Sequence, residues 1–506
     1  MFPGIHSAVT PDKAAVIVAS TGAEITYAEL EVRSARFARW MFDAGLRRGD
    51  HIAVLTDNDP TIFELYWGAL RSGLYITVVN HHGTVDDLAY VITDSGARVL
   101  VASAALAGLA EDLAGRVPPT CRRLAFGGPV AGYELYEDTM SGVSSQPLAE
   151  QPRGSDMAYS SGTTGRPKGI KSPLPDRQIH EAPADALAVL VEAQFGFGPD
   201  TVYLSPAPIY HAAPLRYSAA TQALGGTVVL MDRFEAEKAL ATIDRYAVTH
   251  SQWVPTHFIR MLKLPEQTRE RYDLSSLHVA LHAAAPCPIE VKQAMLDWWG
   301  DVLYEYYSCS ENNGSTLINS EEWRRKPGSV GRDGLQGIAH ICGDDGRELG
   351  PHEVGLIYFQ RDDWYFEYHG DPEKTADARH PDHPTWTTVG DVGYLDEDRY
   401  LYLTDRATFM IISGGVNIYP QQVENCLSMH PAILDVAVIG VPDPEMGQAV
   451  RAVVQLMPGM SPSDDLAHNI IDFARDRLAH YTCPRSVQFV DNLPRTETGK
   501  LAKHRL

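Results

Sequence analysis

The sequence predicts an α/β protein with more than one domain, and three features of the chain support this prediction. Short apolar segments alternate with amphipathic ones as far as Tyr306, which is typical of strands that alternate with helices. The 506 residues exceed the size that a single hydrophobic core usually supports. After Val354 the apolar segments become closely spaced, as in antiparallel hairpins.

The first predicted helix covers residues 26–45. It opens with Thr26-Tyr-Ala-Glu29, a capping-box pattern in which a hydroxyl and a carboxylate bond free N–H groups at the helix start. Gly45 ends the segment, and the apolar side chains between these limits would line one face. Those side chains are Leu30, Ala35, Phe37, Met41 and Phe42.

Strands and helices are then expected to alternate as far as residue 102. The predicted strands are 52–55, 75–79 and 98–102, and the predicted helices are 61–71 and 84–93. The second of these helices opens with Thr84-x-x-Asp87 as its cap. This alternation predicts βαβ units and a largely parallel sheet. Residues 110–153 are richer in Pro, Gly and Ser, so we expect them to form a connection.

The alternation resumes after residue 169. Strands are predicted at 201–204, 227–230, 248–254, 278–281 and 302–306, with helices at 235–246 and 290–299. Residues 354–359 and 400–403 are expected to be hairpin strands. The last part of the chain, about 100 residues, is long enough for a small α+β domain. Its predicted helices are 420–429 and 466–480, and its strands are 436–439, 450–456 and 487–490.

The composition restricts the expected partners and the cell compartment. A formal net charge of −22 argues against a nucleic-acid or acidic-membrane binder, because both of those partners are polyanions. Six scattered cysteines without a Cys-x-x-Cys pair favour unpaired thiols over a disulfide framework or a zinc site. The start lacks the blocks of a secretory signal, and no apolar run approaches the length of a membrane helix. We therefore expect a soluble cytoplasmic protein.

The segment Tyr159–Gly169 combines three glycines, two cations and several hydroxyls directly after a predicted strand. Glycines let backbone N–H groups turn towards a phosphate, and Arg166 and Lys168 add positive charge. The order differs from the common P-loop, which needs Gly-Lys-Ser/Thr. By itself the segment is compatible with a phosphate-binding loop and with a surface turn.

Six segments, taken in order, make the sequence similar to the adenylate-forming superfamily of acyl-CoA synthetases, adenylation domains and luciferases. Tyr159–Gly169 resembles the signature loop of that family. The other five segments are Pro208–His211 (fourth motif), Tyr306–Glu311 (Tyr-Gly-x-Thr-Glu), Val389–Asp391 (Thr-Gly-Asp), Asp405–Gly415 (hinge) and Pro494–Lys500 (C-terminal lysine). The resemblance covers essentially the whole chain and is closest in kind to free-standing bacterial-type acyl-CoA ligases.

The resemblance implies a large N-terminal domain, residues 1–405, of stacked αβα sheets with a small β-barrel-like region. Residues 406–409 would form a hinge, and residues 410–506 a small, mobile α+β domain. In this family the small domain rotates between two half-reactions, so that one active site performs two steps.

The resemblance also implies a set of residues that bind the nucleotide or coenzyme A. The set consists of Ser161, Gly162, Thr163, Thr164, Gly165, Lys168, Ala284, Ala285, Pro286, Tyr307, Ser310, Asp391, Arg406, Gly414 and Gly415. The glycine-rich loop and Lys168 would hold the β- and γ-phosphates, and Tyr307 would stack on the adenine. Asp391 would accept hydrogen bonds from the ribose, with Arg406 on its other side.

Glu311 is the expected ligand of Mg²⁺, together with Thr164, because this hard cation prefers oxygen ligands. A solvated loop acid is the alternative for Glu311. His211 would gate the carboxylate end of the acyl pocket, or it would be a packing residue beside Tyr210. The pair His380-x-x-His383 lies among Pro and Asp residues without a third ligand, which favours a loop over a metal site.

Lys500 is expected to carry the main charge of the first half-reaction. When a carboxylate attacks the α-phosphate, two unit charges about 4 Å apart repel by about 4 kcal/mol at an intermediate dielectric. Cations must offset this repulsion and stabilise the leaving pyrophosphate. By resemblance, Lys500 bridges the acyl carboxylate and the α-phosphate, whereas by position alone it would be a solvated charge near the chain end.

The sequence departs from the family pattern at two places. Thr408 and Phe409 stand where the hinge usually has a charged residue followed by Asp, which affects the balance between the two orientations. Ser308 replaces a glycine in the fifth motif. Asn312 and Asn313 follow that motif and would either bond polar groups of the acid or cap the loop.

The implied reaction is ATP- and Mg²⁺-dependent activation of a carboxylic acid to an acyl-adenylate, with release of pyrophosphate and transfer of the acyl group to coenzyme A. The alternatives are an amide synthetase that uses an amine as acceptor and a non-catalytic nucleotide-binding protein. Expected partners are the acid, ATP and coenzyme A, with the protein a monomer or homodimer. The candidate pocket segments mix apolar and small side chains with scattered polar groups, which suits a medium or bulky aliphatic, aromatic or polycyclic acid. They are Tyr210–Tyr217, Trp253–Thr256, His282–Ala285 and Ser308–Thr316.

We predict that Lys500→Ala abolishes adenylation but leaves thioester formation from supplied acyl-adenylate largely intact, because this lysine acts in only one domain orientation. Pyrophosphate release measures the first half-reaction, and thioester formation from synthetic acyl-adenylate measures the second. Near-normal pyrophosphate release by the variant would contradict the role of Lys500.

Overall fold

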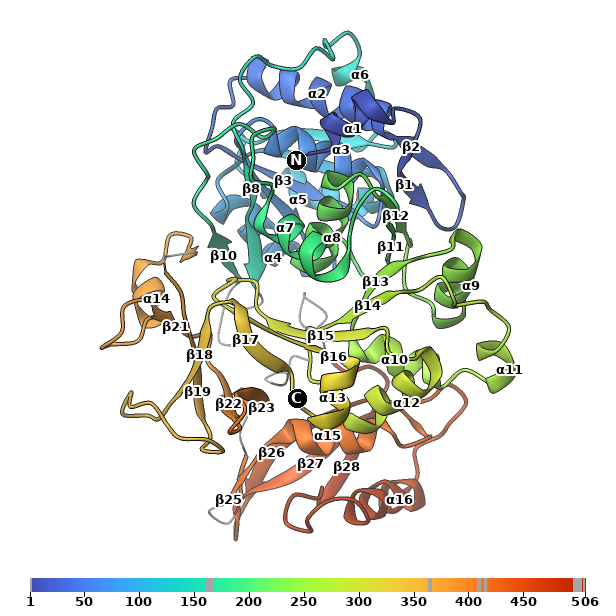
Figure 1. Cartoon of the computed structure of the whole chain (residues 1–506), viewed down its shortest axis with the longest axis vertical. Coiled ribbons are helices and arrows are strands. Elements are labelled where there is room, and N and C mark those ends of the chain that lie inside the picture. The colour runs from blue at the N-terminus through green and yellow to red at the C-terminus, as the bar shows by residue number, and fades with distance from the viewer. Residues whose placement is uncertain are drawn as a thin grey trace. The chain divides into compact units, whose positions relative to one another are not determined.

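The computed structural model describes residues 2–160, 167–362, 366–406, 411–413 and 416–494, together with residues 503 and 506. The chain forms two compact units (Figure 1). Unit 1 comprises Met1–Trp253, Leu264–Ala280 and Tyr365–Pro372. Unit 2 comprises Val254–Lys263, Leu281–Trp364 and Glu373–Leu506.

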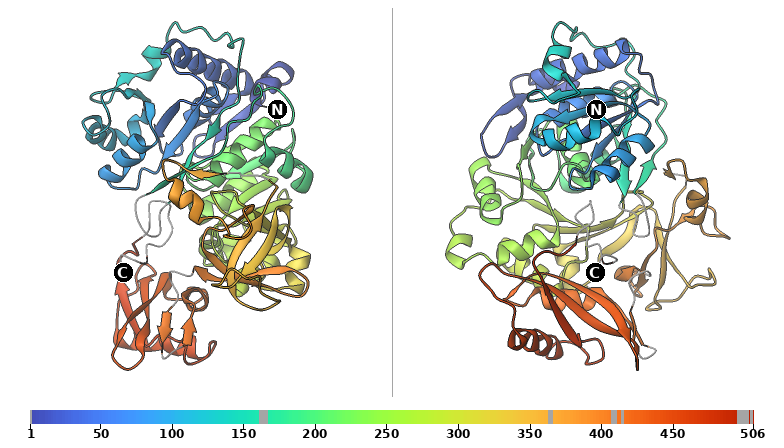
Figure 2. Two further views of the ribbon diagram at one scale, coloured as in Figure 1. Left: turned by 90° about the vertical axis from the view of Figure 1, so that its left-hand side faces the viewer. Right: turned by 180° about the vertical axis from the view of Figure 1, so that it is seen from behind.

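Unit 1 contains a parallel sheet with the strand order β7-β6-β5-β3-β4-β8. All five residues of β3 are buried, as expected for a parallel strand with both faces covered, and Figure 2 shows helices on both sides of the sheet. The strands are β3 (His51–Leu55), β4 (Tyr75–Val79), β5 (Ala97–Ser103), β6 (Arg122–Phe126), β7 (Glu134–Leu135) and β8 (Ser155–Asp156). The helices are α1 (Pro3–Val9), α2 (Tyr27–Asp43), α3 (Thr61–Leu70), α4 (Val85–Asp94), η1 (Ala104–Leu106), α5 (Ala107–Ala114) and α6 (Tyr136–Met140).

Five further strands of unit 1 follow one another in the order β13-β11-β12-β1-β2. They are β1 (Ala14–Val18), β2 (Glu24–Thr26), β11 (Val202–Ser205), β12 (Thr227–Leu230) and β13 (His250–Trp253). Their helices are α7 (Ala186–Phe195), α8 (Ala212–Ala223), α9 (Ala236–Tyr246) and α11 (Glu266–Arg269). The buried Tyr27 hydroxyl donates to the carbonyl of Gly226 at 2.7 Å, and the Trp67 indole donates to Gln222 at 2.7 Å. These bonds join the helices of the parallel sheet to α8 and its following turn.

A third, antiparallel sheet of unit 1 has the order β20-β10-β9. Its strands are β9 (Ala158–Ser160), β10 (Lys168–Lys171) and β20 (Glu367–Tyr368). Strands β9 and β10 are the two arms of the predicted phosphate loop, so the sequence prediction of a strand leading into this loop is confirmed.

Unit 2 begins with a sheet in the order β18-β19-β22-β23-β17-β16-β15, in which every assigned neighbour is antiparallel. The strands are β15 (Leu303–Ser308), β16 (Ser315–Asn319), β17 (Gly331–Gln336), β18 (Ile338–Cys342), β19 (Gly355–Gln360), β21 (Trp386–Thr387), β22 (Asp391–Leu395) and β23 (Tyr400–Arg406). Strand β14 (Val279–His282) crosses the division between the units. The helices are α10 (Pro255–Leu262), α12 (Ile289–Trp299), α13 (Ser320–Arg325) and α14 (Pro372–Asp377).

The expected β-barrel-like region is an open sheet in the part of the chain that the structure describes. Strand β18 pairs with β19 and forms an end of the strand order, so these strands do not close into a barrel. The prediction of antiparallel hairpins was correct, and among the described residues the β-barrel-like region is an open sheet. Closure depends on which sheet edges pair, and the pattern of an individual strand does not determine that.

The last part of unit 2 is an α+β assembly, as predicted. Strands follow the order β25-β24-β27-β26, and β28 pairs with β27 in parallel. They are β24 (Ile411–Ser413), β25 (Val416–Ile418), β26 (Ile433–Asp443), β27 (Gly447–Leu456) and β28 (Ser486–Val490), with helices α15 (Pro420–Ser428) and α16 (Asp464–Arg475). Hinge residues 407–409 lie outside the described residues, so the boundaries proposed around residues 405 and 410 stay predictions.

Two predicted capping boxes are confirmed at α2 and α4. Thr26 Oγ1 accepts from the N–H of Glu29, and the Glu29 carboxylate accepts from the N–H of Thr26 at 2.9 Å. Thr84 and Asp87 make the same reciprocal pair.

The prediction that residues 110–153 are only a connection was wrong, because α5, β6, β7 and α6 lie there. Strand β6 opens with two arginines, and Arg122 pairs with Glu134 on β7. This charged strand therefore lacks the apolar pattern by which the other strands were recognised.

In the part of the chain that the structure describes, no helix combines the length and the apolar character needed to cross a bilayer.

We predict that Thr26→Ala lowers the free energy of unfolding by about 1 kcal/mol, because it removes one bond of a capping box. Thr26→Ser retains the hydroxyl and serves as the matched control. Urea denaturation followed by circular dichroism measures both variants against the wild type. Equal losses in the Ser and Ala variants would show that the hydroxyl does not act as a cap.

Candidate functional site

The predicted Tyr306–Glu311 motif forms the end of β15 and the turn that follows it. The Ser308 hydroxyl donates to the carbonyl of Gly314 at 3.1 Å and closes the turn. Asn312 has a φ of 54°, a left-handed conformation that asparagine tolerates better than most residues. A Cβ at Gly314 would lie 2.1 Å from the Phe359 ring, so only glycine lets the turn approach β19 this closely.

Tyr307 and Asp391 are brought together, although 84 positions separate them in the sequence. The Tyr307 hydroxyl donates to Asp391 Oδ2 at 2.7 Å. The Tyr307 ring lies 6.1 Å from the Phe359 ring, centroid to centroid, at a tilt of 34°. These contacts hold the Tyr307 phenol next to the Asp391 carboxylate. The sequence predicts the first of these groups beside the adenine and the second on the ribose.

Strands β22 and β23 form the expected hairpin, and their register places Asp391 opposite Arg406. Gly390 precedes β22 with a φ of 84°, which glycine adopts without strain. The hairpin brings two predicted ribose-binding positions to the same end of the ladder. The side chain of Arg406 lies outside the described residues.

Glu311 and Ser310 lie on the turn after β15. Glu311 is buried, with 8% of its surface exposed, so it is not an ordinary solvated loop acid. Ser310 is half-buried. Burial, followed by the nearby charge of Glu311, raises the pKa of the Cys309 thiol and keeps it protonated.

Asn313 holds the same turn in place. Its side-chain oxygen accepts from the Cys309 thiol at 3.0 Å, and its side-chain nitrogen donates to the carbonyl of Thr387 at 3.1 Å. Asn313 is 4% exposed, so these contacts favour the loop-holding alternative over contact with the acid. The carbonyl of Asn312 accepts from Arg361 at 2.8 Å, which fastens the turn at a second point.

The segment Ala284–Pro286 follows β14 as a loop. Ala284 has a φ of 76°, Ala284 and Ala285 are exposed, and Pro286 is half-buried. A left-handed alanine is uncommon, and such backbone strain often marks functional positions. The small side chains leave the backbone of this loop accessible, as the predicted contact with adenine requires.

In unit 1, Lys168 lies at the start of β10 and is paired with Ser160 on β9. Its ammonium nitrogen lies 5.7 Å from the centroid of the Tyr368 ring. The centre of the predicted phosphate loop, with Ser161, Gly162, Thr163, Thr164 and Gly165, lies outside the described residues. So do Gly414, Gly415 and Lys500, and the roles of all eight residues stay predictions.

His211 occupies the N-cap position of α8 without a side-chain capping bond, and its ring lies 4.6 Å from that of Tyr210, centroid to centroid. The Tyr210 ring in turn meets His81 and His82 edge-on, at 5.4 and 5.9 Å between centroids. Burial, and then the neighbouring His82, lowers the pKa of His81 and favours its neutral form. The sequence analysis missed His81 and His82, although their place just past the carboxyl end of β4 is one where α/β sheets often bind ligands.

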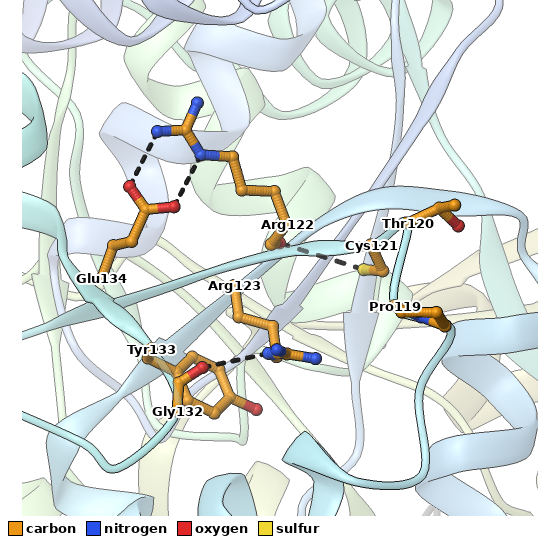
Figure 3. A pocket seen from close by; sticks show the side chains of 8 residues that line it. All are labelled: Pro119, Thr120, Cys121, Arg122, Arg123, Gly132, Tyr133 and Glu134. Atoms are coloured by element: carbon orange, nitrogen blue, oxygen red, sulfur yellow. Dashed lines mark hydrogen bonds and ion pairs between the residues drawn. The ribbon is translucent and has the colours of Figure 1, made fainter.

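A pocket at the edge of the six-stranded sheet contains none of the predicted site residues (Figure 3). Arg122 donates to both carboxylate oxygens of Glu134, at 2.8 and 2.7 Å. Arg123 donates to the carbonyls of Gly132 and Ala114, both at 3.0 Å. Since the protein itself engages both guanidinium groups, the pocket has no evident connection with the predicted chemistry.

His380 holds a loop together through both ring nitrogens. Nδ1 accepts from the N–H groups of Asp382 and His383, and Nε2 donates to the carbonyl of Gly346 at 2.7 Å. Within the described ranges, no group of three or more His, Cys, Asp or Glu side chains is arranged to hold a metal ion. A magnesium nucleotide needs no such group, because Mg²⁺ is usually held by one or two carboxylates with phosphates and water.

Comparison with known proteins decides the family. The model of the AMP-binding enzyme family matches residues 5–367, and that of the AMP-binding enzyme C-terminal domain matches residues 422–500. The chain belongs to the AMP-binding enzyme family. The predicted adenylate-forming resemblance is thereby confirmed over both parts of the chain.

Two curated members of this family match nearly the full chain. Feruloyl-CoA synthase of Amycolatopsis sp. is 33% identical over 97% of this chain and 94% of its own. Long-chain-fatty-acid–CoA ligase FadD13 of Mycobacterium tuberculosis is 29% identical over 98% of this chain and 95% of its own. Among solved structures, amide bond synthetase McbA of Marinactinospora thermotolerans is 27% identical, with a TM-score of 0.81 over 99% of this chain and 98% of its own.

A buried charged cluster near the base of β15 was not predicted from the sequence of this AMP-binding enzyme. The Lys292 ammonium donates to Glu305 Oε2 at 2.6 Å, and both side chains are almost completely buried. His282, with no exposed surface, lies 3.8 Å from the same oxygen. Neither ring nitrogen of His282 has a hydrogen-bond partner in the described part of the structure, and Phe258 packs edge-on against the ring.

Burial, and then the charge of Lys292, lowers the pKa of His282 well below its usual value. The folded state therefore holds His282 neutral, whereas in the unfolded chain it takes up a proton below about pH 6.5. The unfolded state then binds more protons, so the free energy of unfolding falls as the pH drops below about 6.5.

We predict that the His282→Leu variant loses less stability on acidification than the wild type, because the titrating group is removed. The slope of the free energy of unfolding against pH is expected to fall by up to about 1.4 kcal/mol per pH unit below pH 6.5. At pH 7 the variant is expected to be at least as stable as the wild type, since an unsatisfied polar ring is replaced by an apolar group. Urea unfolding at pH 7, 6 and 5 measures both effects. Parallel stability curves for variant and wild type would contradict the assignment.

Proposed function

We propose that this AMP-binding enzyme activates a carboxylic acid with MgATP and transfers the acyl group to the thiol of coenzyme A. In the first step, a carboxylate oxygen attacks the α-phosphate, the bond to pyrophosphate breaks and an acyl-adenylate forms. In the second step, the coenzyme A sulfur attacks the acyl carbon, and AMP leaves. The hydrogen bond between Tyr307 and Asp391 is the observation that carries this proposal.

The Tyr307–Asp391 pair suits the nucleoside part of ATP. Asp391 accepts a hydrogen bond from the Tyr307 hydroxyl through Oδ2, and a carboxylate is an acceptor of the kind that the two hydroxyls of a ribose require. This bond fixes the edge of the phenol ring, and an aromatic ring is the kind of group that stacks on a purine. The exposed backbone of Ala284 and Ala285 supplies polar groups for the purine edge.

Glu311 and Lys168 suit the phosphate part. The Glu311 carboxylate is a hard oxygen donor in a largely buried turn, as a Mg²⁺ ligand requires. Bound Mg²⁺ would offset negative charge on the phosphates. Lys168 adds a positive charge at the arm of the glycine-rich loop, where it would stabilise the leaving pyrophosphate.

Lys500 would place a second cation between the acyl carboxylate and the α-phosphate. A single lysine on a separate small domain allows the enzyme to supply this charge for adenylation and to remove it afterwards. Gly414 and Gly415 would then border the path of the coenzyme A thiol, since glycines leave room for a narrow chain. The role of Lys500 is proposed because the match to the C-terminal domain model extends to residue 500, and the roles of Gly414 and Gly415 are proposed from the resemblance of the hinge segment.

The acceptor is proposed to be coenzyme A because the names of both curated relatives describe CoA thioester formation. An amine is the second candidate acceptor, since the amide bond synthetase McbA has the same fold over almost the whole chain. The names of the relatives cover a long-chain fatty acid and an aromatic acid. We accordingly propose a bulky aliphatic or aromatic acid, with His211, Tyr210, His81 and His82 near its carboxylate end.

The experiment supplies MgATP with a panel of fatty and aromatic acids, adding coenzyme A, primary amines or neither. Pyrophosphate release identifies the acid, and mass spectrometry identifies the product. We expect pyrophosphate release with a subset of acids and a thioester when coenzyme A is present. Amide formation without any thioester would overturn the proposed acceptor, and no pyrophosphate release with any acid would overturn the proposed adenylation.

A further inference from the structure

The strand that carries Lys168 is supported by a segment from much later in the chain. β10 lies between β9, the other arm of the loop, and β20. The register pairs Ile170 with Tyr368, and the N–H of His369 donates to the carbonyl of Gly169 at 2.8 Å. Strand β20 therefore fixes the arm of the phosphate loop from the side opposite to β9.

This register brings the side chains of Lys168 and Tyr368 to one face. Residues two apart on a strand point to the same side, so Lys168 lies on the face of Ile170, diagonal to Tyr368. The Lys168 ammonium accordingly lies 5.7 Å from the centroid of the Tyr368 ring. Tyr368 is 8% exposed and packs edge-on against Phe366, so the position of its ring is restricted.

The backbone beneath this contact is also tightly held. A Cβ at Gly169 would lie 3.1 Å from both Tyr159 and His369, so the segments on either side approach β10 closely. The Tyr159 hydroxyl donates to Asp94 Oδ2 at 2.7 Å and anchors β9 to α4. Lys168 and Tyr368 thus meet on a backbone with little freedom to shift.

An aromatic ring holds a cation in a different way from a carboxylate. The ring face attracts the ammonium group through its quadrupole but carries no net charge. An aspartate in the same place would form an ion pair and offset the positive charge that a phosphate needs. A tyrosine face therefore restricts the ammonium group without adding a negative charge that would offset its positive charge.

We propose that Tyr368 is a positioning residue that places the Lys168 ammonium for the β- and γ-phosphates of ATP. This proposal rests on the proposed function, in which Lys168 contacts those phosphates. Tyr368 acts through Lys168 and is not itself in contact with the nucleotide. Loss of the Tyr368 ring is therefore expected to raise KM for MgATP and to leave KM for the acid and for coenzyme A nearly unchanged.

The chain offers a matched control on the same strand. The Lys171 ammonium lies 4.7 Å from the centroid of the Tyr75 ring, a contact of the same kind at the other end of β10. Tyr75 is 4% exposed, so Tyr75→Leu removes a similarly buried ring. The Tyr75→Leu variant tests whether loss of any buried ring beside a lysine of β10 raises KM for MgATP.

The experiment measures pyrophosphate release by Tyr368→Leu, Tyr368→Phe, Tyr75→Leu and the wild type, with MgATP, acid and coenzyme A varied in turn. We expect Tyr368→Leu to raise KM for MgATP about threefold to tenfold, with KM for the acid and for coenzyme A within twofold of the wild type. Tyr368→Phe keeps the ring face and is expected to restore KM for MgATP. Tyr75→Leu is expected to lower Tm without this increase.

A double-mutant comparison separates positioning from a general structural role. In the Lys168→Ala background, Tyr368→Leu is expected to cause no further rise in KM for MgATP, because its effect passes through the missing ammonium group. An equal further rise in that background would overturn the proposal, as would an unchanged KM in the single variant. If the wild type releases no pyrophosphate with any acid, the proposed function fails. Tyr368 is then tested by the rise in Tm that MgATP causes in the wild type and in the three single variants. A smaller rise for Tyr368→Leu alone would support the proposal, and an equal rise in all four proteins would overturn it.

Discussion

The hydrogen bond from Tyr307 to Asp391 is the contact on which the proposed nucleotide site of unit 2 depends. It joins the end of β15 to the start of β22, two strands that are not neighbours in the sheet. A buried or half-buried carboxylate is costly unless it accepts hydrogen bonds, so the phenol both stabilises Asp391 and directs it. The Asn313 bond to Thr387 repeats this connection a few residues away. Together these bonds hold the Tyr306–Glu311 motif and the Val389–Asp391 motif next to each other.

The charge distribution explains why such local order is necessary. A chain with a formal net charge of −22 repels a polyanionic nucleotide at long range, so binding requires cations at defined positions. In unit 1, the Lys168 ammonium lies against an aromatic face. In unit 2, the Lys292 ammonium is paired with the Glu305 carboxylate in the interior, so its charge is compensated within the protein. The surroundings of the two lysines differ, because the ammonium of Lys292 is paired with a buried carboxylate and also lies 5.0 Å from the centroid of the Trp323 ring.

Much of the fold could be predicted from local patterns. The capping boxes at Thr26 and Thr84 placed two helix starts, and the alternation of apolar segments placed β3, β4, β5 and β11 to β15. The same approach failed at β6, where two arginines replace the apolar pattern. For the site, the motifs identified Tyr307, Glu311 and Asp391, but the order of residues did not reveal the contacts of Asn313, Tyr368 or His282.

The sequence by itself determined the class of protein, because its motifs combine residue types that adenylate chemistry needs and because helix caps and strand periodicity are local properties. Only the tertiary structure decided which of those residues meet. The register of β22 and β23 set Asp391 opposite Arg406, and the addition of β20 to β10 brought Tyr368 to Lys168. Pairing between distant strands depends on the packing of the whole unit, which no short segment of the sequence encodes. That is the physical reason why the phosphate loop was recognised from its own residues, whereas its aromatic support was found only in the folded chain.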